Sequence, residues 1–570
     1  MIYPALMVLL SAAALCFGLG RLVATRLLGL GAALAALLAA LLSGREAPLQ
    51  PAYVLLELHQ LSLHLTPQLA TSERVLALVT LGGGSAALLA LAGAVAPTVR
   101  GFGALFAWAL LSLAAALFSL GTDPLSLAQP VAWALLAITG YGALRSSGTL
   151  KTETSAPLGL SVGLLASLLL AGGLLASSPQ VVAEQLSLGP AALLGFVAAL
   201  LLAGGPPLAL ARREAEDAPA ALGALIYGVA APAAALAWLL RSVPLLPELP
   251  SAWSNGLGLV GSLGFLACGA AALGSPQLRV LLSWVGAGQV ALVVAALSVP
   301  GPLAALAGPG ILVGMLLAGV AAAVAVARFE QTTGSDNYTT GTGGGHALTG
   351  ALWAFGALAL LGLPPLWGFW PRLWLLEALL AARPWMLAPL MAGFVLTSLA
   401  LLAPLGRLWA SQQEGSPALT TSWAALGAAL FVGLPLLGLG VRPTLVWDHW
   451  LQHVTAAPDV FPLAMNNYTA GLLAGVFLLL AGITLIRARP ERTVQLDPDE
   501  HLVTLSPAAL GAALRPLAGL SDLRELLNRL WHWLTQLSEW LRLLMSLMEQ
   551  RYYLLGVLGA LITIMLLMAQ

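Results

Sequence analysis

The chain has 570 residues, of which 59% are hydrophobic and only 8% charged, and its mean hydropathy is +0.92. These values exclude a soluble globular protein and predict a polytopic membrane protein embedded in a lipid bilayer. The formal net charge is zero, so no basic face favours a nucleic-acid partner. The two cysteines, Cys16 and Cys268, lie in apolar runs without the spacing of a disulfide framework or a metal site. We therefore expect no metal site.

Long apolar segments recur along the chain. A helix that crosses a bilayer needs roughly 20 mostly apolar residues, and by this measure the sequence offers about 14 to 16 such helices. The fold class that follows is all-α. The predicted transmembrane segments are 2–20, 24–43, 74–97, 100–121, 125–145, 157–177, 190–211, 218–240, 254–274, 278–299, 303–328, 346–383 (interrupted), 385–405, 420–441, 467–487 and 551–569.

Two of these segments contain the same interrupting pattern. Residues 202–208 read LAGGPPL and residues 360–366 read LLGLPPL, 158 positions later. Proline removes a backbone donor and clashes with the preceding turn, so a proline pair beside glycine should break a membrane helix. Paired broken helices are typical of transporters built from repeats. We predict two inverted five-helix repeats, with chance recurrence as the alternative, and helix breaks at Gly204, Pro206, Pro207, Gly362, Pro364 and Pro365.

A charge cluster follows the first proline pair. Arg212 and Arg213 precede the acidic residues Glu214, Glu216 and Asp217. We consider Glu214 a candidate for an ion path. The alternative is a solvated loop in which neighbouring charges partly neutralise one another.

The C-terminal tail predicts a different kind of helix. From Ser521 to Glu549, apolar residues recur at intervals of three and four, and charged residues fill the opposite side. This pattern indicates an amphipathic helix, and its three tryptophans favour a position along the membrane interface. We expect this lateral helix to precede a last transmembrane helix.

Enzyme motifs are missing from the sequence. It contains no P-loop, no GxSxG, no HExxH and no flavin or nicotinamide fingerprint. We therefore expect no cofactor in this chain and no catalysis by it alone.

Three ordered stretches resemble one family. The stretch 207–241 is similar to the loop and following helix of the antiporter-like membrane subunits of respiratory complex I, which Mrp-type antiporters and energy-converting hydrogenases share. The stretch 275–289, SPQLRVLLSWVGAGQ, resembles a second family segment, with Arg279 in the place of its lysine. The stretch 355–378, FGALALLGLPPLWGFWPRLWLLEA, resembles a third, with Arg372 in the place of a lysine. These motifs place the resemblance at about 75–400.

The resemblance also implies an axis of ionisable groups through the bilayer centre, which this sequence lacks. The family's charged positions fall on Ala134, Leu202, Tyr227 and Gly314. An intramembrane charge costs roughly 2.5–3.5 kcal/mol on insertion scales, so it persists mainly where function retains it. The charged or polar candidates that remain for an ion path or a structural role are Arg279, Arg372, Glu377, Arg241, Glu214 and Tyr227.

Arginine stays protonated where a lysine can release its proton. We therefore expect Arg279 and Arg372 to be fixed anchors, with Glu377 as a partner for Arg372. The predicted divisions are 1–99, N-terminal helices and an outer loop; 100–250 and 251–406, the two repeats; 407–500, further helices; and 501–570, the lateral and final helices.

The resemblance implies a subunit of a complex-I-like or membrane-bound hydrogenase-like respiratory complex, in a prokaryotic plasma membrane. Other membrane subunits would be its partners and would hold the redox cofactors. With its charged axis largely lost, the subunit would be structural or coupling. Two alternatives remain: an active proton- or sodium-translocating antiporter subunit, and a membrane enzyme acting on lipid-linked substrates.

Overall fold

The computed structural model divides into two compact units, Met1–Ser521 and Asp522–Gln570, which are described separately. The residues that it describes are 2–45, 53–58, 61–65, 69, 71–94, 101–148, 150–176, 190–210, 216–243, 251–339, 347–409, 423–444, 514, 531–532, 535–536 and 539.

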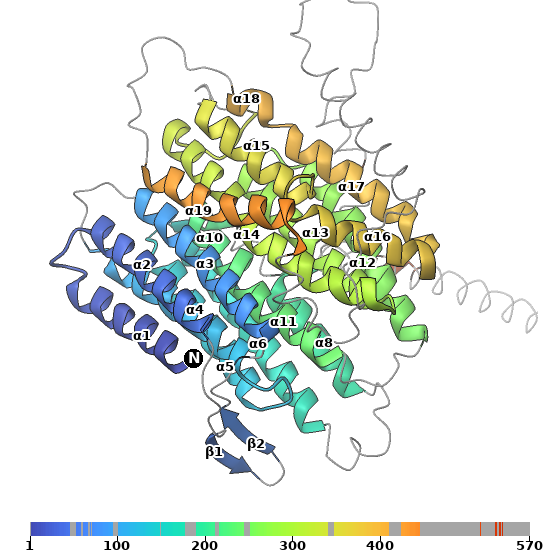
Figure 1. Ribbon diagram of the computed structural model, residues 1–570, viewed down its shortest axis with the longest axis horizontal. Helices are drawn as coiled ribbons and strands as arrows, with labels where there is room; N and C mark the ends of the chain where they lie inside the picture. Colours follow the sequence, from blue (N-terminus) through green and yellow to red (C-terminus); the bar gives the residue numbers. More distant parts are fainter. Residues whose placement is uncertain are drawn as a thin grey trace, which may run out of the picture. The chain divides into compact units, whose positions relative to one another are not determined.

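The first unit begins with a helical layer and a small hairpin. Its helices are α1 (Ile2–Leu19), α2 (Thr25–Ser43), α3 (Thr71–Ala94) and α4 (Gly103–Gly121). Strands β1 (Tyr53–Leu58) and β2 (Leu61–Leu65) pair antiparallel and lie beyond the ends of the helices in Figure 1. The all-α fold class is confirmed, and this short hairpin is an addition that the sequence analysis did not predict. LSLHL at 61–65 alternates apolar and polar residues with the period of a strand.

The next helices lead to the first proline pair. They are α5 (Ala128–Arg145), α6 (Leu150–Ala176) and α8 (Pro190–Ala203), followed by α10 (Ala220–Gly223), the π-helical η1 (Ala224–Ala230) and α11 (Ala231–Ser242). The π-helical turns come just before Pro232. Its ring clashes with the carbonyl four residues earlier, and a wider turn relieves that clash.

The second half of the bundle contains the other proline pair. Its helices are α12 (Ser251–Leu273), α13 (Leu278–Leu297), α14 (Pro302–Thr333), α15 (Ala347–Leu361), α16 (Phe369–Ala382), the 3₁₀ turn η3 (Pro384–Met386), α17 (Leu387–Leu402), α18 (Leu405–Trp409) and α19 (Trp423–Val441).

Helix α14 lies at the centre of this bundle. It has 32 residues, and 94% of its most apolar stretch is buried. It packs against α3, α13, α15, α16, α19 and η1, as Figure 1 lets the reader follow. Its sequence is rich in alanine and glycine, which allows neighbouring backbones to approach closely.

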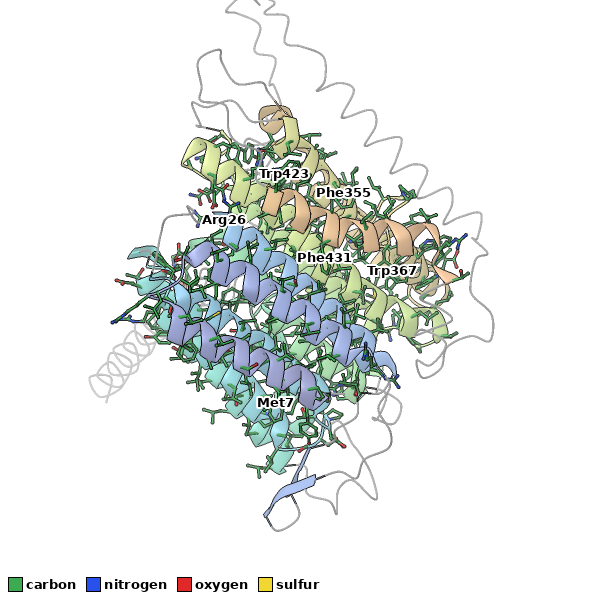
Figure 2. The ribbon with its side chains drawn as sticks, turned by 60° about the vertical axis from the view of Figure 1, so that its left-hand side comes forward. Met7, Arg26, Phe355, Trp367, Trp423 and Phe431 are labelled. Atoms are coloured by element: carbon green, nitrogen blue, oxygen red, sulfur yellow. The ribbon has the colours of Figure 1, made fainter. Side chains whose placement is uncertain are left out.

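The helices fit a multi-pass membrane protein. Within the described residues, 11 helices are long and apolar enough to cross a bilayer, and α8 and α15 contain shorter apolar stretches. The outer helix α1 has only 28% of its apolar stretch buried, and Met7 on it is 67% exposed (Figure 2). The polytopic helical prediction is confirmed for the described part. The predicted segments 467–487 and 551–569 lie outside it.

The second unit is described at few positions. Trp531, His532, Thr535, Gln536 and Glu539 are helical and exposed. They lie within the amphipathic helix predicted for 521–549, and the rest of that segment lies outside the described residues. Its lateral position stays a prediction.

Candidate functional site

The two proline pairs break their helices with the same backbone geometry. Helix α8 is followed by Gly204, whose φ is +67°, and α15 is followed by Gly362, whose φ is +69°. In both, the two residues after the helix donate back to carbonyls three and five positions earlier: Gly204 to Leu201 (3.4 Å), Gly205 to Leu200 (2.9 Å), Gly362 to Ala359 (3.1 Å) and Leu363 to Leu358 (3.0 Å). The peptide bonds Pro206–Pro207 and Pro364–Pro365 are both cis. The predicted helix breaks are therefore present at both positions.

Each break exposes a carbonyl that a continuous helix would satisfy. The carbonyl oxygens of Leu202 and Leu360 would accept from the N–H four residues later, and those residues are Pro206 and Pro364. An unsatisfied carbonyl in an apolar interior costs free energy comparable to a lost hydrogen bond. Each break therefore needs a donor from elsewhere in the chain.

At the second break, Arg372 supplies that donor. Its Nη2 donates to the carbonyl oxygen of Leu360, at a short distance, and to Oε1 of Gln289 at 2.7 Å. Its Nη1 donates to the carbonyl oxygen of Gly368 at 2.8 Å. Arg372 is 6% exposed and Gln289 1%. The C-terminal end of a helix carries a partial negative charge, so a guanidinium beside the end of α15 is electrostatically favoured.

Two glycines make room for this guanidinium. A Cβ atom at Gly362 would collide with Nη1 of Arg372, and one at Gly368 would lie 2.5 Å from the same atom. Tryptophans then tie the segment to its neighbours. Trp367 donates its indole N–H to the carbonyl of Gly310 on α14 at 3.0 Å, and Trp370 donates to Gly440 on α19 at 2.9 Å. The second break is held rigidly from several sides.

In the described part of the chain, the first break has no such set of donors. Among the described residues, no hydrogen bond reaches the carbonyl oxygen of Leu202. A small cavity of about 30 Å³ lies beside it. Apart from the rings of Tyr141 and Tyr227, its described lining is aliphatic or glycine: Leu136, Ala137, Gly140, Gly159, Val162, Gly163, Leu201, Leu202, Ile226 and Ala231. No acid, lysine, arginine or histidine is among these residues.

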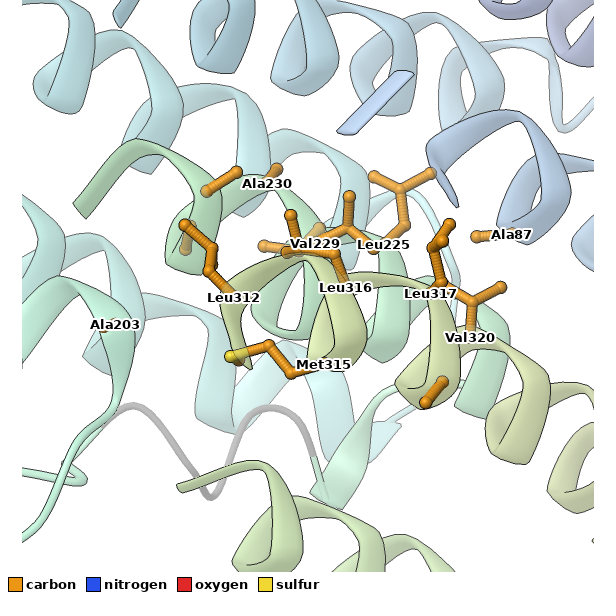
Figure 3. Close-up of a cluster of buried hydrophobic side chains, with 14 of the residues drawn as sticks. Ala87, Ala203, Leu225, Val229, Ala230, Leu312, Met315, Leu316, Leu317 and Val320 are labelled. Atoms are coloured by element: carbon orange, nitrogen blue, oxygen red, sulfur yellow. The ribbon is translucent and has the colours of Figure 1, made fainter. Parts of the chain in front are cut away.

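The seam between η1 and α14 is also apolar. Figure 3 shows side chains from η1 facing side chains from α14, with Leu225, Val229, Leu312, Met315 and Leu316 among those labelled. The family's charged positions that fall on Gly314 and Ala134 lie on α14 and α5, and neither offers a polar side chain. The described bundle centre is therefore poor in ionisable groups at this level.

A larger cavity lies between the two breaks. Its volume is about 100 Å³, which gives room for several water molecules. Ala203 and Gly204 of the first break line one side, and Leu360 of the second break and Gln289 line another. The full lining is Ala203, Gly204, Ala220, Gly223, Ala224, Tyr227, Gly228, Arg279, Leu282, Ser283, Gly286, Ala287, Gln289, Val290, Met315, Gly319 and Leu360. The polar side chains in this lining are those of Tyr227, Arg279, Ser283 and Gln289.

Arg279 lines this cavity and belongs to an ionic cluster at the beginning of α13. Its Nε lies 2.8 Å from Oε1 of Glu330 and 3.2 Å from Oδ2 of Asp336. Its Nη1 donates to the carbonyl oxygen of Ala218 at 2.9 Å and to that of Asp217 at 3.4 Å. These contacts join α13 to the end of α14 and to the segment after the first break. Arg279 is therefore held by oxygen atoms on two sides.

Arg241, near the end of α11, joins that helix to the end of α4 and to α3. It pairs with Glu73 on α3 at 3.0 Å. It also donates to the carbonyl oxygens of Ser119 (3.1 Å), Leu120 (3.0 Å) and Thr122 (2.9 Å), which close α4. Beside them, Gln129 donates to the Ser119 hydroxyl at 2.7 Å. This cluster neutralises the arginine and caps a helix.

The predicted site residues therefore fall into separate groups. Arg279, Tyr227, Gly204 and the second break meet at the larger cavity, whereas Arg241 does not line it. The contacts of Arg372 are to carbonyls and Gln289, and the predicted partner Glu377 is not among them because it lies more than a helical turn further along α16. Glu214 lies outside the described residues. The sequence did not indicate Gln289 as a partner of Arg372, nor Glu73, Glu330 and Asp336 as partners of Arg241 and Arg279.

The described residues thus form a polytopic membrane protein with two broken helices and a partly polar cavity between them. Residues 158–399 match the family model for the transmembrane region of NADH:quinone oxidoreductase and Mrp antiporters. A comparison with curated proteins finds no significant match. The resemblance noted in the sequence is confirmed over residues 158–399, the part of the chain that is similar to this antiporter-like membrane family.

Solved structures share the fold at low identity. A chain of the Mrp complex from Dietzia sp. DQ12-45-1b has a TM-score of 0.73 and 20% identity, with 91% of this chain and 59% of that chain covered. This chain thus spans only 59% of that relative's length. A chain of the membrane-bound sulfane sulfur reductase, an archaeal respiratory membrane complex, has a TM-score of 0.67 and 16% identity, with 83% of this chain and 99% of that chain covered. A chain of respiratory complex I from Thermus thermophilus has a TM-score of 0.68 and 20% identity, with 83% of this chain and 100% of that chain covered.

Proposed function

We propose that this chain is an antiporter-like membrane subunit that joins other membrane subunits in a respiratory or antiporter-type complex but does not itself carry ions across the bilayer. Its similar structures come from an Mrp complex, a sulfane sulfur reductase and complex I. Redox cofactors, where the assembly uses them, are held by partner chains, and the membrane is an energy-transducing one of the prokaryotic plasma-membrane type.

The observation that carries this proposal is that the three arginines predicted for an ion path, Arg241, Arg279 and Arg372, are all fixed by oxygen atoms. Arg372 is bound by three oxygens, Arg279 by two carboxylates and two carbonyls, and Arg241 by Glu73 and the end of α4. A transported proton needs groups or waters in hydrogen-bond reach of each other across about 30 Å of hydrocarbon. At the first break, the described lining around Leu202 offers only phenol hydroxyls. This supports a closed path.

Active ion translocation is the second candidate, and one observation favours it. The cavity of about 100 Å³ carries Tyr227, Ser283 and Gln289, which could order water between the two breaks. In this case Tyr227 would be a relay, since it lines both cavities. The two candidates therefore differ in what the Tyr227 hydroxyl does.

Substitution of Tyr227 by Phe in the intact assembly separates them. The exchange keeps the ring and removes the hydroxyl. We expect wild-type assembly and an unchanged ion flux per turnover, measured in vesicles that contain the purified complex. Mass spectrometry of the same preparation identifies the partner subunits. A several-fold lower flux from a normally assembled complex would make this chain a conducting subunit.

A further inference from the structure

We infer that the second break is a cation-binding site made of three oxygen atoms, which this chain occupies permanently with its own Arg372 guanidinium. The oxygens are the carbonyls of Leu360 and Gly368 and Oε1 of Gln289. This inference rests on the proposed function, because it states how the path is closed.

The three oxygens come from three parts of the fold. Leu360 belongs to the last turn of α15, and its carbonyl is available because Pro364 has no N–H. Gly368 lies at the start of α16, and Gln289 lies on α13. Unwound backbone carbonyls at helix ends are the groups that bind monovalent cations in broken-helix transporters. Neutral oxygens without a carboxylate suit a single positive charge, so the ligand class is a hard monovalent cation.

The fit of the guanidinium shows that the site is filled. A Cβ atom at either Gly362 or Gly368 would contact Nη1 of Arg372. At the matching glycine of the first break, Gly204, a Cβ atom would meet nothing within 4 Å. The same backbone turn is thus occupied in one half and open in the other.

The occupied site lies beside the cavity between the breaks. Leu360 and Gln289, which bind the guanidinium, also line that cavity, and Arg279 lines it as well. Water or a small cation in the cavity therefore meets a fixed positive charge at Gln289 and Leu360. Because Arg372 is covalently attached, the site cannot exchange its cation.

Removal of the tethered cation tests the site directly. In the full assembly, Arg372→Ala keeps the three oxygen atoms and leaves between them a cavity that a guanidinium ion fits. Thermal unfolding is measured with millimolar guanidinium chloride, sodium chloride or choline chloride at equal ionic strength. We expect guanidinium, and more weakly sodium, to raise the unfolding temperature of Arg372→Ala saturably by about 2 °C over choline. The wild type should not respond.

Two further variants make the result specific. Arg372→Ala combined with Gln289→Leu should lose the guanidinium response, because one of the three oxygens is gone. The Arg372→Lys protein should assemble, and guanidinium should not change its unfolding temperature, because the lysine ammonium occupies the site. If Arg372→Ala does not assemble while Arg372→Lys does, the requirement for a cation is supported.

Two results would overturn the inference. One is an Arg372→Ala protein that assembles and unfolds alike in all three salts. The other is an Arg372→Met protein as stable as the wild type. Neither result touches the proposed function, which is decided by the ion flux of the Tyr227→Phe complex.

Discussion

The two helix breaks share a backbone but not a set of partners. Both end in a glycine with φ near +68° and a proline pair. The second is bound by Arg372 and Gln289 and tied by Trp367 and Trp370 to α14 and α19. The first borders aliphatic side chains and open space at Gly204. Proline and glycine alone therefore set the turn, and distant side chains decide whether the exposed carbonyl is satisfied.

The largest contrast is expected from matched glycine substitutions. Gly362→Ala adds a Cβ atom at positive φ that collides with Arg372, so strain and overpacking together should cost about 2–5 kcal/mol of folding free energy. Gly204→Ala carries only the strain of positive φ, because nothing lies near its Cβ, and should cost about 1–2 kcal/mol. Unfolding of the two purified variants in detergent compares them. Equal losses would mean that the guanidinium is not seated against Gly362.

A smaller loss is expected from Arg279→Leu. The change leaves Glu330 and Asp336 near each other without their cation, and both are only partly exposed. A cost of about 2–3 kcal/mol follows, below that of a fully buried pair. Yield of the assembled complex and its ion flux are measured together, with Arg279→Lys as the control that keeps the charge. Normal assembly with fewer ions per turnover would argue that Arg279 belongs to a conducting path.

The smallest of these effects is expected from Gln289→Leu. It removes one acceptor from Arg372 and keeps the side chain's size, so the loss should be about 1–2 kcal/mol. Ser283→Ala is the matched control on the same helix. Its hydroxyl lines the same cavity and donates to the carbonyl of Val280 at 2.8 Å, with Oε1 of Glu216 at 3.3 Å as the longer alternative. Because both contacts are made by a partly exposed hydroxyl, the change should cost about 0.5 kcal/mol. If Ser283→Ala lowered the free energy of unfolding as much as Gln289→Leu, the bond between Gln289 and Arg372 would have no particular role in stability.

The breaks could be predicted from the sequence because their cause is local. Proline lacks an N–H wherever it stands, so Pro206 and Pro364 indicate a broken helix without any knowledge of neighbours. The partner of Arg372 could not be predicted in this way. Gln289 is 83 positions away, and a glutamine in an apolar run gives no signal of which helix faces it. Glu377 is the acidic residue nearest to Arg372 in the sequence, but five residues along a helix place it on a different face from Arg372.

The β1–β2 hairpin is a second feature that the sequence indicates only in part. Its second strand has an alternating pattern that could have been recognised at Leu61–Leu65, but short strands are easily missed in a chain dominated by membrane helices. The two inverted repeats remain a prediction. The helix order fits it, since among the described helices the break follows the fourth of each proposed repeat, α8 and α15.

The central claim is that the path through this chain is closed at both breaks. An experimental structure of the intact assembly, at a resolution that shows ordered water, tests it most directly. We predict water in the cavity between Gly204 and Gln289 that ends at the Arg372 guanidinium and does not pass Leu202. A continuous chain of water molecules through either break, reaching both membrane surfaces, would contradict the account.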